Sequence, residues 1–256
     1  MIEVKGLSKS FGDHQALKNL DLHVKTGSIY GLIGVNGSGK TTLIKHITGV
    51  LLPDSGTVKI DGQDVYDNIS VKERLGYIPD DLYFFNSYDL KGMKSFYRGL
   101  YPNFSEQRFD AMVKDFGLPE GKKLSKFSKG MQKQAAFALT MSAMPEVLVL
   151  DEPVDGLDPV VRHKLWRYVM QDVAERSATV LISSHNLREL EGVRDSVGII
   201  SGGEMKLEGD IEDLKNYVTK LRENRGEGTE TDLSLEEVFL YEMGEDPLPG
   251  AKGGLK

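Results

Sequence analysis

Apolar and polar positions in the first eighty residues follow the pattern of β-strands. They alternate from Ile2, form a second run over 17–24, and become continuous from Ile29 to Ile33. A short uninterrupted apolar run indicates a strand buried on both faces, and a glycine-rich turn follows this one. The pattern also predicts three further elements: a helix over 40–48 and strands over 57–60 and 75–78.

Residues 81–144 show helical periodicity instead. Four apolar residues recur there at i, i+3, i+4 and i+7, namely Phe109, Met112, Val113 and Phe116. Ser105 is a favourable N-cap residue and Gly117 follows the last apolar position, so we predict a helix over 105–116. A second helix is expected from 129 to 144, where Pro145 ends it.

Strands and helices alternate again after Pro145. Buried strands separated by crossover helices form mainly parallel sheets that helices cover on both faces. From residue 216 the pattern weakens, and we expect a polar loop over 222–232. The remaining predicted elements are strands over 147–150, 179–183 and 197–200 and helices over 159–173 and 235–243.

Composition and charge exclude several classes of protein. The 256 residues include no cysteine, which excludes disulfide scaffolds, thiolate zinc sites and thiol nucleophiles. The net charge of −7 argues weakly against a nucleic-acid partner. Residues 216–256 carry a net charge of −4, so the rest of the chain carries only −3. No segment approaches the ~18 apolar residues of a membrane span, so any membrane role requires a partner.

A phosphate-binding loop is predicted between the strand at 29–33 and the helix that follows it. Its glycines let backbone N–H groups surround phosphate oxygens, Lys40 would reach the terminal phosphates, and Thr41 would ligate Mg²⁺. The alternative is a glycine-rich turn with a solvated lysine, which the position between strand and helix disfavours. The predicted nucleotide-binding residues are Gly34, Val35, Asn36, Gly37, Ser38, Gly39, Lys40, Thr41 and Thr42.

Two further strands end in residues suited to hydrolysis. Asp151 and Glu152 follow the apolar strand after Pro145, where Asp151 would lie near the Mg²⁺ shell and Glu152 would accept a proton from attacking water. His185 ends the next buried strand and would hydrogen-bond the γ-phosphate or the water. The alternatives are an acidic loop before a helix and an ordinary surface histidine.

The segment 127–132 stands at the start of a predicted helix, shortly before the Asp151–Glu152 strand. It resembles the signature motif of ABC transporter ATPase subunits, and other motifs of that family occur in order. Phe11 stands where the family has an aromatic residue that stacks on adenine, 156–158 resemble its D-loop, and His185 its switch histidine. The resemblance covers about residues 1–215, and the sequence around 157–162 is most similar to ATPases of bacterial peptide and antibiotic exporters.

The resemblance implies an α/β fold of the P-loop NTPase type. Its features are a mainly parallel sheet, an N-terminal antiparallel β subdomain and a helical insertion. We therefore expect an ATP-binding core over 1–80 and 145–215, a helical subdomain with the signature motif over 81–144, and a short acidic C-terminal tail over 216–256.

The family also implies a head-to-tail dimer with ATP at the interface. Each site would take its P-loop from one subunit and Ser128 and Gly130 from the other. The second subunit can be another copy or a paralogue. The dimer would drive a separate transmembrane permease, which places the chain in the cytoplasm on the inner face of the cell membrane.

The sequence departs from the family pattern at two places. Asp80 follows the Tyr-x-Pro segment where the family usually has Gln; a carboxylate can coordinate Mg²⁺ but repels the γ-phosphate when the metal is absent. We therefore expect ATP binding to depend more strongly on Mg²⁺ than in a relative with Gln. Lys129 and Met131 replace glycine and glutamine in the signature, which affects contacts near the ribose.

An aromatic group follows Asp80, in the region that borders the permease groove in the family. Tyr83, Phe84, Phe85 and Tyr88 would form an exposed contact there or pack into the core of the helical insertion. We assign three further aromatic residues to that core, namely Phe96, Tyr97 and Tyr101.

Other functions remain open at this point. A soluble ABC ATPase of the translation or DNA-repair type lacks a permease, but such proteins fuse two ATPase units or carry very long insertions. A GTPase would need an Asn-Lys-x-Asp motif, which the chain lacks. A catalytically inactive regulatory subunit is disfavoured by Glu152 and His185.

Overall fold

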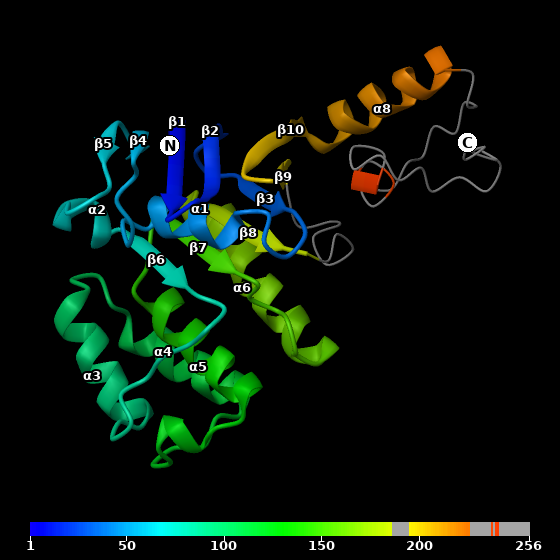
Figure 1. Ribbon diagram of the computed structural model, residues 1–256. Coiled ribbons are helices and arrows are strands. Elements are labelled where there is room, and N and C mark those ends of the chain that lie inside the picture. Colours follow the sequence, from blue (N-terminus) through cyan, green and yellow to red (C-terminus); the bar gives the residue numbers. More distant parts are fainter. Residues whose placement is uncertain (186–194, 226–236, 238, 241–256) are drawn as a thin grey trace.

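Two sheets and a group of helices make up the part of the chain that the computed structural model describes, which is residues 1–185, 195–225, 237, 239 and 240. Figure 1 shows the sheets together and α3, α4 and α5 (green) as a separate helical group beside them. These helices lie in the sequence between two strands of the larger sheet, so they form an insertion in it.

The smaller sheet is antiparallel and comes from the N-terminal part of the chain. Its strand order is β2-β1-β4-β5, and Ile2 pairs with both Val24 and Ile60. Helix α2 follows β5, whereas α1 follows a strand of the larger sheet. The bounds are β1 Ile2–Phe11, β2 His14–Val24, β4 Ser55–Ile60, β5 Gln63–Asp64, α1 Lys40–Ile47 and α2 Ile69–Lys72.

The larger sheet has the order β10-β9-β3-β8-β7-β6, and all its neighbours are parallel except β10 and β9. Most of its strands were predicted because their apolar runs are continuous. The fold class is confirmed: a mainly parallel sheet, an antiparallel β subdomain and a helical insertion. The bounds are β3 Ile29–Ile33, β6 Leu75–Ile78, β7 Val147–Asp151, β8 Thr179–Ser184, β9 Ser196–Ser201 and β10 Glu204–Asp210.

Three of the longer helices begin at residues whose side chains cap them. Ser105 accepts from the Arg108 N–H, Ser128 from the Met131 N–H, and Asp158 from the N–H groups of the first turn of α6. Each cap satisfies N–H groups that a helix start would otherwise leave without partners. The bounds are α3 Leu90–Leu100, α4 Glu106–Phe116, α5 Lys129–Ser142, α6 Pro159–Arg176, α8 Ile211–Arg225 and the 3₁₀ turn Leu124–Lys126.

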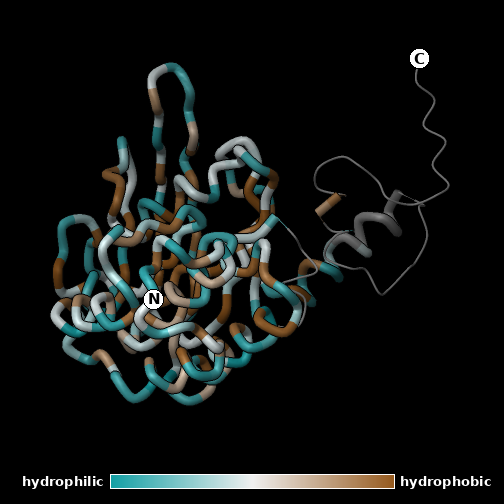
Figure 2. Tube along the Cα trace, turned by 90° about the horizontal axis from the view of Figure 1, so that it is seen from below, coloured by the Kyte–Doolittle hydropathy of each residue, from teal (hydrophilic) through white to brown (hydrophobic). Residues whose placement is uncertain are grey.

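Alternate residues of the larger sheet enter two separate hydrophobic cores. On β7, Leu148 and Leu150 pack with α5 and α6, whereas Val147 and Val149 pack with α1 and the smaller sheet. Both faces of the strand are buried for this reason, and its sequence is apolar throughout. In Figure 2 the hydrophobic segments gather in the interior and the hydrophilic ones at the outer turns.

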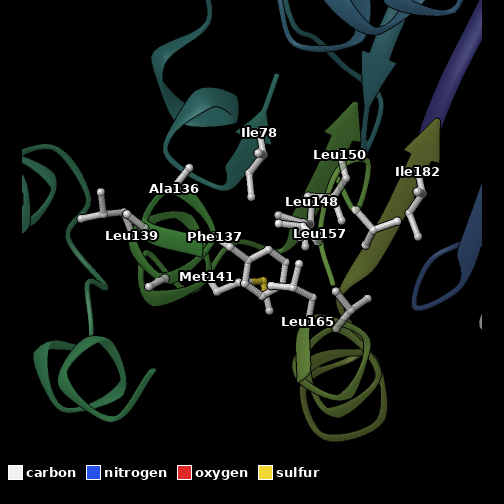
Figure 3. Close-up of a cluster of buried hydrophobic side chains, with 14 of the residues drawn as sticks. Ile78, Ala136, Phe137, Leu139, Met141, Leu148, Leu150, Leu157, Leu165 and Ile182 are labelled. Carbon is white, nitrogen blue, oxygen red and sulfur yellow. The ribbon is translucent and has the colours of Figure 1, made fainter. Parts of the chain in front are cut away.

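Phe137 of α5 lies at the centre of the core beneath the larger sheet. Its side chain is 2% exposed and lies among residues of β7, α6 and α5 itself (Figure 3). Leu148 and Leu165 are among those neighbours. This packing fixes the position of α5 relative to the strands.

Buried charges join the helical insertion to α6. Asp172 of α6 is 3% exposed and accepts from Arg108 of α4 and Arg176 of α6, each at 2.6 Å. The attraction of two cations offsets the free-energy cost of removing this carboxylate from water. The insertion is therefore held to the core by charge as well as by apolar packing.

Several expectations require correction. Residues 222–225 end helix α8, so the loop expected from 222 is wrong there, and its part at 226–232 lies outside the described residues. Phe96 was assigned to the core but is 37% exposed, because the outer side of α3 carries it. The helix expected over 235–243 falls mostly outside the described residues, although 237, 239 and 240 are helical.

Within the described residues, no helix combines the length and the apolar character that crossing a membrane requires.

Replacing Phe137 by alanine should lower the free energy of unfolding by about 3–5 kcal/mol, because it leaves a cavity between α5 and β7. Urea unfolding measures this change. Tyr66→Ala is the matched control, since Tyr66 is 50% exposed and its removal should change stability by less than ~0.5 kcal/mol. Equal effects of the two variants would contradict the assigned core.

Candidate functional site

Four neighbouring parallel strands of the larger sheet deliver the predicted site residues to one edge. The P-loop follows β3, His185 follows β8, Glu152 follows β7, and Asp80 follows β6 after one proline. Carboxyl ends of parallel strands meet at the same edge, and ligands of open α/β sheets bind there. Residues far apart in the sequence are brought together in this way.

The P-loop is a tight turn whose backbone admits no larger side chains at key positions. A Cβ on Gly34 would lie 2.5 Å from both the Ile200 carbonyl oxygen and the Ser38 hydroxyl, and Gly39 has φ of +111° just before α1. Lys40 folds over the loop and donates to the carbonyl of Gly34 at 2.6 Å. The loop is thus shaped as a cradle above the start of a helix, where N–H groups favour an anion.

The turn between β9 and β10 supports the P-loop from outside. The N–H of Gly203 donates to the Ser38 carbonyl at 3.0 Å, and the Gly203 carbonyl accepts from the Lys18 N–H at 2.9 Å. One residue of this turn therefore joins the P-loop to β2. These two hydrogen bonds hold the P-loop at a fixed distance from β2.

A pocket of about 300 Å³ opens above the P-loop. Most of the predicted nucleotide-binding residues line it, and the Phe11 ring, 49% exposed, stands at its wall. Sequence reasoning missed His14 and Ala16, because their place in the pocket depends on the fold of β2 rather than on a motif. The lining residues are Phe11, His14, Ala16, Asn36, Gly37, Ser38, Gly39, Lys40, Thr41, Thr42, Asp80 and Glu152.

Asp151 is almost fully buried at the end of β7. Its Oδ1 accepts from the Ser183 hydroxyl at 2.5 Å, whereas its Oδ2 has no hydrogen-bond partner among the described residues. The Ser38 hydroxyl is likewise buried without a partner there. A buried polar atom left free beside a phosphate-binding loop is available to a ligand.

Ser183 of β8 holds the two adjacent carboxylate residues together. Besides donating to Asp151, its hydroxyl accepts from the Glu152 N–H at 3.1 Å. No sequence motif marks this residue, because only the pairing of Asp151 with Ser183 across β7 and β8 brings it to the site.

Glu152 lies between a histidine and the P-loop lysine. Its Oε2 is 3.0 Å from Nδ1 of His185, and its Oε1 is 3.8 Å from Nζ of Lys40. The residue has φ of +46°, which non-glycine residues rarely adopt and which is common at functional sites. The predicted pair of Glu152 and His185 is thus in contact in the structure.

Burial and negative charge shape the protonation of neighbouring groups. Burial lowers the pKa of Lys40, and the carboxylates of Glu152 and Asp151 oppose this change. Burial, with Asp151 and Asp80 nearby, raises the pKa of Tyr77 to about 12. Burial and nearby carboxylates therefore act on both groups.

Asp80 forms an ion pair that sequence reasoning did not include. Its Oδ1 lies 3.2 Å from Nζ of Lys133 on α5, and the same Nζ donates to the carbonyl of Glu152 at 2.9 Å. The Asp80 carboxylate is therefore partly neutralised before any ligand binds. This pair reduces the phosphate repulsion that Asp80 alone would cause.

The signature residues do not line the P-loop pocket. The Ser128 hydroxyl caps α5, and Gly130 lines a second pocket of about 410 Å³ together with Asp80, Lys133 and Gly156. Within one chain the structure does not bring Ser128 to Lys40's pocket. The signature residues and the P-loop of one chain therefore line different pockets.

The aromatic residues after Asp80 divide into two groups. Phe84 packs on the core, whereas Tyr83, Phe85 and Tyr88 are 80%, 41% and 36% exposed. The centroid of the Phe85 ring lies 5.2 Å from the ring centroid of Tyr88 and 5.3 Å from that of Phe96. We call Tyr83, Phe85, Tyr88 and Phe96 the aromatic patch.

Another hollow lies between α3 and α4. It measures about 590 Å³ and is lined by residues such as Lys94, Phe109 and Gly117. None of the predicted site residues reaches it, and Lys94 is already paired with Asp110 and Glu106. The predicted site residues therefore have no part in this hollow.

Comparison with known proteins agrees with this geometry. A family model described as ABC transporter matches residues 17–155, and one described as an AAA domain, putative AbiEii toxin of a type IV TA system, matches residues 120–191. The chain is 34% identical over 222 residues to the ABC transporter ATP-binding protein YtrB of Bacillus subtilis, covering 87% of this chain and 76% of YtrB. It is also 34% identical over 226 residues to the bacitracin transport ATP-binding protein BcrA of Bacillus licheniformis, covering 87% of this chain and 74% of BcrA.

Solved structures give the same result. A structure described as the ATP binding subunit of an ABC transporter has a TM-score of 0.83 and 28% identity, covering 95% of this chain and 99% of that one. A dimeric bacterial ABC transporter cassette has a TM-score of 0.75 at 22% identity, covering 82% of this chain and 99% of that one. The second likeness shows a shared fold.

Replacing Ser183 by alanine should lower the rate of nucleotide hydrolysis about tenfold, because it removes a hydrogen bond to a buried charge worth about 1.5–3 kcal/mol. A steady-state phosphate-release assay measures this. The control is Ser142→Ala, a buried serine on α5 whose hydroxyl has no partner among the described residues. If both variants retained full activity, Ser183 would have no part in holding the carboxylates.

Proposed function

This chain belongs to the ABC transporter family as an ATP-binding and ATP-hydrolysing subunit, and on that premise we propose which residues bind and hydrolyse ATP and what the subunit contacts. The contact of Glu152 with His185 above the P-loop carries the proposal. We also propose the division into an ATP-binding core over 1–80 and 145–215, a helical subdomain over 81–144 and a tail over 216–256.

Glu152 is the base that accepts a proton from the attacking water. Its carboxylate is 13% exposed, faces the pocket and contacts His185, which orients it and can hydrogen-bond the γ-phosphate. Lys40 turns from the carbonyl of Gly34 to the terminal phosphates, where its charge stabilises the transition state. The ring of Phe11 stacks on adenine.

Thr41, Asp151 and Asp80 would hold Mg²⁺ together with the phosphates. The set fits this ion, because it offers hard oxygen ligands and the Oδ2 atom of Asp151 has no partner among the described residues. No group of three or more His, Cys, Asp or Glu side chains in the described residues forms a complete metal site alone. When bound, Mg²⁺ would neutralise charge on the phosphates.

A second ATPase subunit completes the site. Ser128 and Gly130 lie outside the pocket of their own P-loop, at the start of a helix whose N–H groups can bind a γ-phosphate. We propose that they meet the nucleotide of a second subunit in a head-to-tail dimer. The dimeric cassette among the structural neighbours supports this arrangement.

A transmembrane permease is the other partner. The name of YtrB, an ABC transporter ATP-binding protein, and that of BcrA, a bacitracin transport protein, support this partner and a peptide or antibiotic substrate. The aromatic patch on the helical subdomain provides an exposed apolar contact for the permease. Through it the subunit would lie on the inner face of the cell membrane.

Glu152→Gln should lower steady-state ATP hydrolysis at least about 100-fold while ATP binding persists, since general bases contribute 10²–10⁴-fold. Because ATP is then trapped, a dimer should accumulate with ATP and Mg²⁺, which light scattering measures. The matched control is Glu146→Gln at the opposite end of β7, where Glu146 pairs with Arg74 on the surface. Full hydrolysis by Glu152→Gln would disprove the role of the base.

Phe85→Ser should abolish co-purification with the permease and leave basal ATP hydrolysis of the isolated subunit within about twofold. The expected cause is loss of the central ring of the aromatic patch, which contacts Tyr83, Tyr88 and Phe96. Ile69→Ser, a 74% exposed apolar residue on α2, is the matched control. Undiminished co-purification of the Phe85 variant would exclude the patch as the contact.

A further inference from the structure

Lys133 connects three parts of the candidate site. It lies on α5, one turn after Ser128 and Gly130, and its ammonium group contacts Asp80 after β6 and the main chain of Glu152 after β7. Its side chain is only 13% exposed. A lysine held in this way by two acceptors has a defined position rather than a solvated one.

The contact with the Glu152 carbonyl is the more important of the two. At 2.9 Å it is shorter than the 3.4 Å hydrogen bond that the same carbonyl accepts from the Asp155 N–H. Glu152 has a positive φ of +46°, a conformation that persists only where neighbouring groups hold it. The charged donor of Lys133 is such a group.

The ion pair with Asp80 contributes less. The Asp80 side chain is 53% exposed, and ion pairs in contact with water stabilise weakly because solvent screens them. Asp80 does line both the P-loop pocket and the pocket beside Gly130, so Lys133 also reduces negative charge there. This effect concerns nucleotide binding rather than the geometry of Glu152.

Rigid packing fixes the helix that carries Lys133. Phe137 follows one turn later on α5 and is locked among core residues of β7 and α6, as Figure 3 shows. On β6, Gly76 lies so close to α5 that a Cβ there would be 2.8 Å from Thr140. The backbone position from which the Lys133 side chain extends is therefore fixed relative to the strands.

We propose that Lys133 is a positioning residue for ATP hydrolysis: through its ammonium group, α5 holds the main chain of Glu152 so that the carboxylate faces His185 and the pocket. This inference rests on the proposed role of Glu152 as the base. The helix that presents Ser128 and Gly130 to a second subunit is thereby joined directly to the hydrolytic residue of its own chain.

Lys133→Met removes the charged donor and leaves an unbranched apolar side chain that is one atom shorter. We expect kcat for ATP hydrolysis to fall about tenfold, because the base is misplaced. The KM for ATP should change by no more than about threefold, because the P-loop is intact and solvent screens the exposed Asp80 carboxylate once it is unpaired. Lys126→Met, an exposed lysine just before the same helix, is the matched control and should leave both constants unchanged. An unchanged kcat in the Lys133 variant would overturn the proposal.

A second variant and a binding measurement guard against simple misfolding. Lys133→Gln keeps a polar group in the pocket but is shorter and uncharged, so it should reproduce the loss of kcat. Both variants should bind a fluorescent ATP analogue in the presence of Mg²⁺ within threefold of the parent chain. A loss of kcat that occurs only together with loss of binding would show a structural role and overturn the proposal.

Combination with Asp80→Asn separates the two contacts. If Lys133 acts through Glu152, Lys133→Met should lower kcat about tenfold in the Asp80→Asn background as well. If it acts only through Asp80, the double variant should match Asp80→Asn alone, which would overturn the route through Glu152. Failure of the proposed function is a different result, because Glu152→Gln would then hydrolyse ATP normally.

Discussion

The in-register parallel pairing of β3, β8 and β7 is the constraint on which the whole site depends. Ile33 pairs with Ser184, and Ser183 with Asp151, so the three strands end at one level. The residues that directly follow the three strands therefore lie close to one another. A single register therefore places a phosphate cradle, two carboxylates and a histidine together.

Charge at this edge is balanced by contacts that leave selected atoms available. Lys40 donates to a carbonyl group of its own loop, and Glu152 contacts a histidine. One oxygen of Asp151 accepts a hydrogen bond from a serine. Buried charges are costly without partners, so this arrangement keeps the site stable before ATP arrives. The proposed function gives both groups a role: the unpaired oxygen of Asp151 would help to hold the metal, and Lys40 would bind the phosphates.

The sequence predicted those parts whose signal is local. β3, β7 and β8 are continuous apolar runs, and the motifs around Lys40 and Glu152 are read directly from neighbouring residues. β10 escaped prediction because this half-exposed edge strand mixes charged and apolar residues, and α3 because Gly92 and Gly99 weaken its helical pattern. The contacts of Ser183 and Lys133 depend on which elements lie side by side, which no spacing along the chain reveals.

The support that Gly203 gives to the P-loop has a consequence for the order of synthesis. Its N–H reaches the Ser38 carbonyl, yet the ribosome adds residue 203 long after residue 38. Domains generally fold as units while the chain is made. The emerging N-terminal half therefore carries a complete P-loop motif without its supporting turn, and the mature geometry of the nucleotide pocket is delayed until β9 and β10 have left the ribosome.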